Sequence, residues 1–71
     1  MSSPVKEAAI GTVDGVNTDF DTGAAYEPGS VVAFLNGQAR PGHQTELGGT
    51  AFRLEFAPET GDTVAVYYVP L

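Results

Sequence analysis

The sequence predicts a small all-β domain, and three features of the chain carry that prediction. Apolar residues recur with period two in short segments, which is the spacing of side chains on one face of a strand. Nine glycines and five prolines in 71 residues divide the chain into pieces too short for stable helices. Dipeptides typical of tight turns lie between the pieces. We therefore expect an antiparallel β-sandwich or barrel-like meander of about five to seven short strands.

Two main strands are expected in the first half of the chain. The segment from Val16 to Phe20 alternates between apolar and polar side chains, with both of these residues on one face. Residues 30–35 form an almost continuous apolar run, which is the pattern of a strand buried on both faces. Asn36-Gly37 favours a type I′ turn, because both residues tolerate positive φ, and this turn should join the run to a short strand at residues 38–40.

Two more strands are expected in the second half. Residues 51–56 alternate, with three apolar side chains directed inward: Phe52, Leu54 and Phe56. Residues 63–69 are rich in β-branched and aromatic residues, which favour a strand. Tyr67 and Tyr68 fall on opposite faces of that strand, so one should pack in the core and the other should face outward.

Turns are expected wherever glycine and proline cluster between these segments. The predicted turns are at residues 26–29, 41–42, 48–49 and 58–62. The sequence shows no internal repeat and no domain boundary, so residues 11–71 should form one domain.

Residues 1–10 are a separate question. The segment from Val5 to Ile10 is too short for a stable helix and is followed by Gly11. Two alternatives stay open for it. It is either an extended N-terminal arm that becomes ordered on a partner, or an edge strand of its own sheet.

Charge and composition exclude several classes of protein. Three basic residues face nine acidic ones, so the net charge is -6, and a field of that sign repels phosphate backbones and anionic lipids. We therefore expect no nucleic-acid partner and no membrane partner. Hydrophobic residues make up 42% of the chain, which is too many for a disordered protein.

The small size of the chain predicts assembly. A folded chain of this length buries only about 60% of the surface that its unfolded form exposes. Cysteine is absent and His43 is the only histidine, which excludes disulfides, thiolate metal sites and histidine zinc sites within one chain. We expect no cofactor, and we expect a homo-oligomer or a part of a larger assembly. The sequence contains neither a secretory signal nor an apolar run of about 20 residues, so synthesis in a cytoplasm is expected.

One segment resembles a catalytic motif. Asp21-Thr22-Gly23-Ala24 reproduces the signature of aspartic proteases, in which two aspartates share a proton and activate water. Those enzymes also need a second apolar-apolar-glycine segment, and residues 66–71 contain no glycine. We interpret the motif as a strand end followed by a turn, and we expect no enzymatic activity.

Four oxygen-bearing side chains suggest a calcium loop: Asp14, Asn17, Asp19 and Asp21. An EF-hand loop that starts at Asn17 needs glycine at its sixth position and glutamate at its twelfth, where this chain has Thr22 and Pro28. The EF-hand is therefore excluded. A looser site near Asp19 and Asp21 is left open, beside the simpler interpretation of a turn and the solvent face of a strand.

Four stretches of the chain resemble a β module found in virion proteins of tailed bacteriophages. They are DGVNTDFDT at residues 14–22, YEPGSVVAFLNG at residues 26–37, FRLEFAP at residues 52–58 and GDTVAVYY at residues 61–68. In that pattern DGVNxxF opens the module, PGSxxVxLNG forms the central hairpin, and F-x-P-x-x-GD-x-V-x-x-x-Y closes it. The resemblance covers about residues 11–69 and departs from the usual pattern between Gly42 and Gly48.

The resemblance implies a minor structural protein of the virion, made in the cytoplasm of the bacterial host. It would dock in many copies on other virion proteins of the capsid, connector or tail. The alternative is a receptor- or carbohydrate-binding module of a tail fibre, against which the absence of tryptophan weighs. Apolar side chains near the two termini are the expected partner interface: Val5, Ala8, Ile10, Tyr67, Tyr68 and Leu71.

Overall fold

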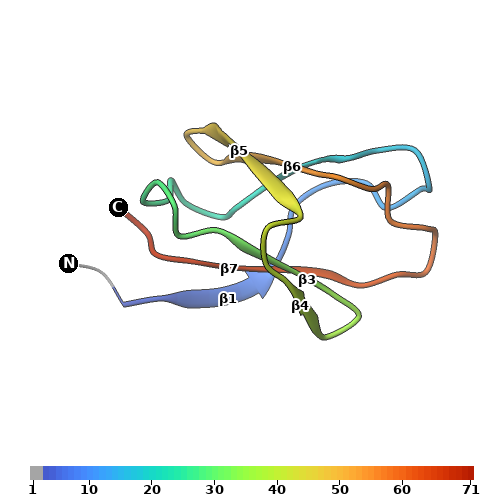
Figure 1. Cartoon of the computed structure of the whole chain (residues 1–71), viewed down its shortest axis with the longest axis horizontal. Coiled ribbons are helices and arrows are strands. Elements are labelled where there is room, and N and C mark those ends of the chain that lie inside the picture. The colour runs from blue at the N-terminus through green and yellow to red at the C-terminus, as the bar shows by residue number, and fades with distance from the viewer. Residues whose placement is uncertain (1–2) are drawn as a thin grey trace.

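The computed structural model describes residues 3–71 and contains seven β-strands in two antiparallel sheets (Figure 1). The strands are β1 (Val5–Ala8), β2 (Asp19–Asp21), β3 (Val32–Leu35), β4 (Gln38–Arg40), β5 (Gln44–Gly48), β6 (Ala51–Leu54) and β7 (Val64–Tyr68). No helix occurs in residues 3–71. The prediction of an all-β chain with short strands is confirmed.

The larger sheet has four strands in the order β1-β7-β3-β4, and the smaller sheet has three in the order β2-β6-β5. The C-terminal strand β7 is therefore central, with Val66 opposite Glu7 of β1 on one side and Ala33 of β3 on the other. The chain passes from one sheet to the other after β1, where Ile10 exchanges backbone hydrogen bonds of 2.9 and 2.8 Å with Asp21 of β2.

Buried side chains from both sheets form one hydrophobic cluster. Its members are Phe20, Tyr26, Val31, Ala33, Phe52, Leu54, Val64, Val66 and Tyr68. Phe20 and Phe52 lie directly opposite each other on β2 and β6, and their rings stack with centroids 6.3 Å apart. The inward positions predicted for Phe52 and Leu54 are confirmed, and Phe56 packs against the cluster from beyond the end of β6.

The turns lie where glycine and proline predicted them. Asn36 and Gly37 both have positive φ, of 51° and 84°, as a type I′ turn requires between β3 and β4. The Asn36 side chain also accepts a hydrogen bond from the Thr63 N–H at 2.8 Å, which ties this hairpin to the start of β7. The Pro58–Asp62 turn closes with a bond of 2.9 Å from the Asp62 N–H to the Glu59 carbonyl.

Two details of the predicted strands are wrong. Val16 does not share a strand with Phe20; it is 80% exposed, because the Asp14 carboxylate accepts the N–H groups of Val16 and Asn17 and bends the chain into a turn. The apolar run at residues 30–35 is not buried equally on both faces. Ala33 is buried in the core, whereas Phe34, on the opposite face, is only half-buried.

The N-terminal segment adopts one of its two alternatives. Val5–Ala8 is an edge strand of the four-stranded sheet, antiparallel to β7, with Val5 packed against the core. The extended arm expected over residues 1–10 is therefore not found in residues 3–10, and residues 1–2 lie outside the described part of the chain. The strand β1 begins at the same end of the molecule as the C-terminus (Figure 1).

Candidate interaction surface

The four-stranded sheet has one face that lies away from the hydrophobic core, and we call it the outer face. Side chains alternate along a strand, so the register of the sheet assigns seven residues to it. They are Lys6 and Ala8 of β1, Ala65 and Tyr67 of β7, Val32 and Phe34 of β3, and Ala39 of β4. Six of these side chains are apolar or aromatic. The outer face thus departs from the usual alternation, in which one face of an antiparallel sheet is polar.

Lys6 is the one charged residue of the outer face, and its side chain lies flat against that face. The Lys6 Nζ lies 4.1 Å from the centroid of the Phe34 ring, within the range of a cation–π interaction. Because Phe34 is on β3, the Lys6 side chain crosses the outer face of β7 to reach it. The lysine stem therefore covers part of the apolar surface, and its ammonium group points toward the middle of the sheet.

The residues expected at a partner interface fall into three groups. Ala8 and Tyr67 lie on the outer face, and the exposed fraction of Tyr67 is 39%. Ile10 and Leu71 are exposed elsewhere, Ile10 at the crossing between the sheets and Leu71 at the C-terminus.

The other two residues, Val5 and Tyr68, are turned inward. Val5 is half-buried against the core, and Tyr68 is 1% exposed. Since Tyr67 and Tyr68 are neighbours on β7, only one of them can face outward, and that residue is Tyr67.

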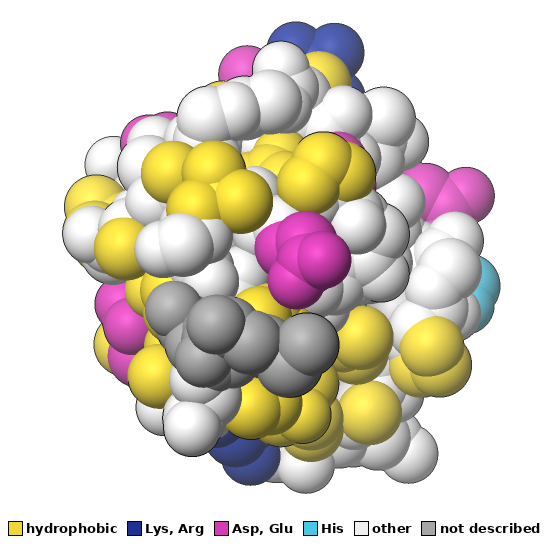
Figure 2. All heavy atoms as spheres, turned by 90° about the vertical axis from the view of Figure 1, so that its left-hand side faces the viewer, with side chains coloured by type: hydrophobic (Ala, Val, Ile, Leu, Met, Phe, Trp, Pro, Cys, Tyr) yellow, Lys and Arg dark blue, Asp and Glu magenta, His cyan; other side chains and the backbone are white. Residues whose placement is uncertain are grey.

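A second apolar surface covers the end of the molecule at which the chain terminates. Figure 2 shows hydrophobic side chains gathered over this end. The Leu71 N–H donates to the Ala25 carbonyl at 3.0 Å, which holds the C-terminus there. Leu47 is also exposed and precedes Gly48, whose N–H donates to the Tyr26 hydroxyl at 3.0 Å. Sequence reasoning missed Leu47; its place in a short alternating segment, with Thr45 and Leu47 on one side, was the signal.

The buried Tyr68 fixes the N-terminal strand to the rest of the domain. Its hydroxyl donates to Glu7 Oε1 at 2.9 Å, and Glu7 Oε2 accepts the Gly23 N–H at 3.1 Å. Burial and the hydrogen bond to the Glu7 carboxylate raise the pKa of Tyr68 above its ordinary value of 10.0. One carboxylate therefore joins β1, β7 and the turn that follows β2.

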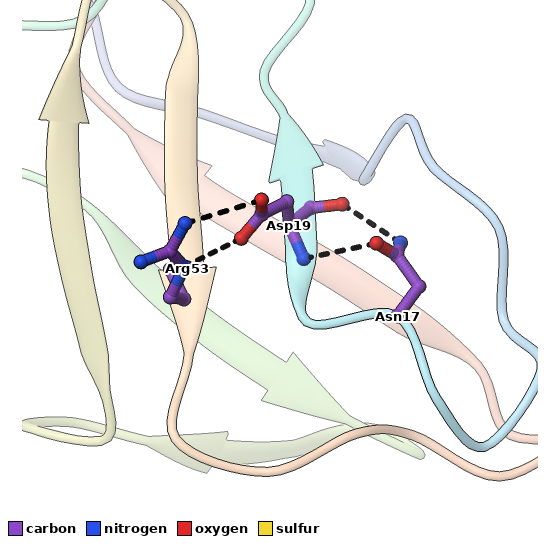
Figure 3. Close-up of polar contacts among 3 residues, drawn as sticks. All are labelled: Asn17, Asp19 and Arg53. Atoms are coloured by element: carbon purple, nitrogen blue, oxygen red, sulfur yellow. Dashed lines mark hydrogen bonds and ion pairs between the residues drawn. The ribbon is translucent and has the colours of Figure 1, made fainter.

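The outer edge of β2 is closed by a side chain (Figure 3). Asn17 Oδ1 accepts the Asp19 N–H at 3.2 Å, and Asn17 Nδ2 donates to the Asp19 carbonyl at 2.8 Å. The amide thus bonds to both backbone groups of Asp19, as a neighbouring strand would. The Asp19 carboxylate is bound on the other side by Arg53 of β6, whose Nε donates at 2.6 Å. The hydrogen bond from Arg53 holds the pKa of Asp19 below its ordinary value of 3.8.

Two side chains of β5 bind backbone groups of the segment that leads into β3. Both carboxylate oxygens of Glu46 accept the Gly29 N–H, and one of them accepts the Val31 N–H at 3.1 Å. Gln44 Nε2 donates to the Val31 carbonyl at 3.0 Å. Two β5 side chains therefore supply hydrogen bonds where β4 does not reach.

The motif that resembles an aspartic protease is embedded in local hydrogen bonds. Thr22 is 2% exposed, and its hydroxyl donates to the Ala24 carbonyl at 2.5 Å. Asp21 Oδ1 accepts from the Thr50 hydroxyl at 3.0 Å, and the backbone of Asp21 pairs with Ile10. The Asp-Thr-Gly sequence is thus the end of β2 and the turn after it.

Other candidate groups are similarly accounted for. Asp14 holds the turn before β2, and His43 Nδ1 lies 2.7 Å from Glu55 Oε2 on the surface. Residues 3–71 contain no group of three metal-ligating side chains, and no cavity was found among them. Nor does the described part of the chain include a helix long and apolar enough to cross a membrane. Comparisons of the sequence and the structure with protein-family models, curated proteins and solved structures found no match.

Proposed function

We propose that this chain is an accessory structural protein of a tailed-phage particle, and that it docks in many copies on the capsid, connector or tail. The proposal combines the resemblance of residues 11–69 to a β module of virion proteins with one structural observation. That observation is the outer face of the four-stranded sheet, where six of seven side chains are apolar or aromatic. Within residues 3–71 no layer covers this face, and an uncovered apolar face is suited to binding another protein.

Multivalent docking explains why a modest surface would be enough. A four-stranded sheet with strands of three to five residues offers a small contact area. Many copies on a symmetric lattice need only a weak interface each, because repeated contacts reinforce one another. Tyr67, an aromatic residue at the centre of this sheet and partly exposed, is the residue we expect to contribute most to binding.

The finer architecture belongs to the same proposal. We propose that the two sheets pack face to face as a small β-sandwich, which would place the outer face and the free side of the three-stranded sheet on opposite surfaces. The shared hydrophobic cluster supports this arrangement. In a sandwich the core is closed by the domain itself, so the outer face stays available to a partner.

Particle composition tests the proposal. Particles purified from the phage or prophage that carries the gene should contain this 7.4 kDa chain in many copies, measured by quantitative mass spectrometry. Complementation with Tyr67→Asp should reduce incorporation, because a charge then lies on the outer face. Val16→Asp makes the same charge change at an exposed loop residue and should incorporate normally.

Two outcomes would count against the proposal. Absence of the chain from purified particles would exclude a virion role. A few copies per particle, together with binding of the purified chain to a glycan array, would favour the receptor- or carbohydrate-binding alternative instead.

A further inference from the structure

The N-terminal strand β1 has an open backbone edge. The Ala9 N–H donates to the Val64 carbonyl at 3.0 Å, so Ala9 and Val64 form a hydrogen-bonded pair. Such pairs alternate along antiparallel strands, so Glu7 and Val5 also bond to β7, and the backbone groups of Lys6 and Ala8 point the other way. No partner for those groups is found within residues 3–71.

The edge strands of the two sheets differ in how far other groups cover them: β2 is covered, whereas β1, β4 and β5 present free backbone groups within residues 3–71. On β2, the Asn17 amide and Ile10 bond to the backbone groups of Asp19 and Asp21. The backbone of Val31, just before β3, is bonded to the Gln44 and Glu46 side chains. On the far side of the four-stranded sheet, β4 has only three residues and presents the backbone of Ala39 alone. Natural sheets block open edges because such edges recruit other strands.

The residue that would normally guard this edge does not do so. A lysine on an edge strand discourages pairing, because its charge must be kept in water. Lys6 instead reaches back over β7, and its ammonium group lies on the Phe34 ring. On the outer face, the space next to the open edge is therefore bordered only by Ala8 and the base of the lysine stem.

We propose that the β1 edge binds an extended strand of a different protein, with a basic residue opposite Glu7. This inference deepens the proposed docking role and rests on it for its biological setting. Residues directly opposite each other on antiparallel strands carry their side chains on the same face. A partner strand that bonds to Lys6 and Ala8 places one of its side chains beside Glu7, on the face toward the core. The partner residues before and after it lie opposite Lys6 and Ala8 and extend the apolar outer face.

The chemistry of Glu7 selects a cation at that position. Each of its carboxylate oxygens accepts one hydrogen bond, from Tyr68 or Gly23, and each retains capacity for another. An arginine or lysine opposite could therefore bind without breaking either bond. The excess of nine acidic over three basic residues attracts a basic partner in the same way.

The same charge disfavours a second copy of this chain on the edge. A two-fold pairing that uses the backbone of Lys6 and Ala8 in both copies is centred on Glu7, and it sets two carboxylates opposite each other. Centring the pairing on Lys6 sets two ammonium stems opposite each other and brings in Pro4, which has no N–H to donate. Centring it on Ala8 requires Ile10, whose backbone is already bonded to Asp21.

Peptide titrations followed by NMR test the proposal on the intact chain. The probe is the capped peptide Ser-Val-Arg-Val-Ser, and the matched probe carries Glu in place of Arg. We expect the arginine peptide to shift the amide signals of Lys6 and Ala8 and to bind more tightly than the glutamate peptide. Glu7→Gln keeps an oxygen for the Tyr68 hydroxyl but removes the charge, so it should reduce the preference for arginine severalfold.

Paired proline variants separate edge binding from charge attraction. Ala8→Pro removes an outward N–H on β1, and we expect binding to weaken by about tenfold or more. Ala39→Pro makes the same change on the opposite edge of the same sheet and should bind like the wild type. A peptide with N-methylated valines cannot complete the ladder, and it tests the same point without altering the protein.

Several results would overturn the assignment. These are equal losses in Ala8→Pro and Ala39→Pro, unchanged binding of the N-methylated peptide, or signal shifts confined to other strands. Concentration-dependent shifts at Lys6 and Ala8 without peptide would assign the edge to a second copy instead. Absence of the chain from phage particles would remove the proposed function but leave these titrations unaffected.

Discussion

The Tyr68 hydroxyl donates a 2.9 Å hydrogen bond to Glu7, and through it the C-terminal strand holds the N-terminal strand. The second oxygen of the same carboxylate accepts the Gly23 N–H. A side chain at Gly23 would collide with that oxygen, so glycine allows the close approach. Three segments far apart in the sequence thus depend on one carboxylate.

Removing the Tyr68 hydroxyl should destabilise the domain. Tyr68→Phe leaves the Glu7 carboxylate with one bond fewer at a part-buried position, and we expect a loss of about 1–2 kcal/mol in the free energy of unfolding. Urea denaturation at neutral pH measures it. Tyr67→Phe, on the outer face of the same strand, is the control. An equal effect of the two changes would contradict the role assigned to the Tyr68 hydroxyl.

Alkaline pH should destabilise the wild type through the same residue. The pKa of Tyr68 is raised above 10.0 in the folded state, so folding favours the protonated phenol. Its contribution is fully present below pH 10.0 and is lost as the pH rises through the folded pKa. Urea midpoints measured across this range should fall for the wild type and fall less for Tyr68→Phe. Parallel curves would show that Tyr68 titrates normally.

Acid should remove the contribution of Asp19. Its pKa is lowered by the hydrogen bond from Arg53, so the unfolded state binds a proton more readily than the folded state. The stabilisation is present when the pH is above 3.8, the ordinary pKa of Asp, and it is lost as the pH falls through the lower pKa of the folded state. Asp19→Asn should flatten the acid limb of a plot of unfolding free energy against pH. The contact is exposed, so salt should also weaken it.

Loss of the Asn17 amide should open the edge of β2. Asn17→Ala removes both bonds to the Asp19 backbone and the 3.0 Å bond to the Thr12 carbonyl. We expect a destabilisation of about 1 kcal/mol, because these bonds are exposed and water replaces part of their strength. Val16→Ala is the control, since the Val16 side chain is exposed and makes no such bond. Equal urea midpoints for both variants would refute the capping role.

The β3–β4 turn should depend on glycine. Gly37 has φ of 84°, and Gly37→Val should cost about 1 kcal/mol or more because a β-branched side chain is strained there. Thermal unfolding monitored by circular dichroism measures the loss. Asn36→Gly keeps the turn conformation but removes the bonds to Thr63 and Asp62, so it reports the value of the side chain separately. A tolerated valine would mean that the turn rearranges.

Asp21 should have no catalytic role. Asp21→Asn keeps an oxygen that can accept from the Thr50 hydroxyl, so stability should change by less than about 0.5 kcal/mol. The purified wild type should cleave no peptide at acidic pH. A pepstatin-sensitive activity that disappears in the variant would overturn this prediction.

The local chemistry of the chain was sufficient to predict its elements. Asn36-Gly37 predicts its turn because the tolerance of positive φ is a property of these two residue types themselves. The alternation at residues 51–56 likewise predicts its inward face, because the period of a strand is independent of its neighbours. Both features depend only on residues that are close together in the sequence, so they can be predicted without knowledge of the fold.

Only the tertiary structure decided what depends on residues distant in the sequence. The alternation between Val16 and Phe20 was misleading, because Asp14 turns the chain before a strand can form. Which of Tyr67 and Tyr68 is buried follows from which face of the four-stranded sheet packs on the hydrophobic cluster, and the sequence does not state that face. The open edge of β1 is likewise invisible in the sequence, because it results from the place of β1 at the end of the four-stranded sheet. Strand pairing and edge closure are long-range choices among many compatible partners, and packing of the whole domain is what selects one of them.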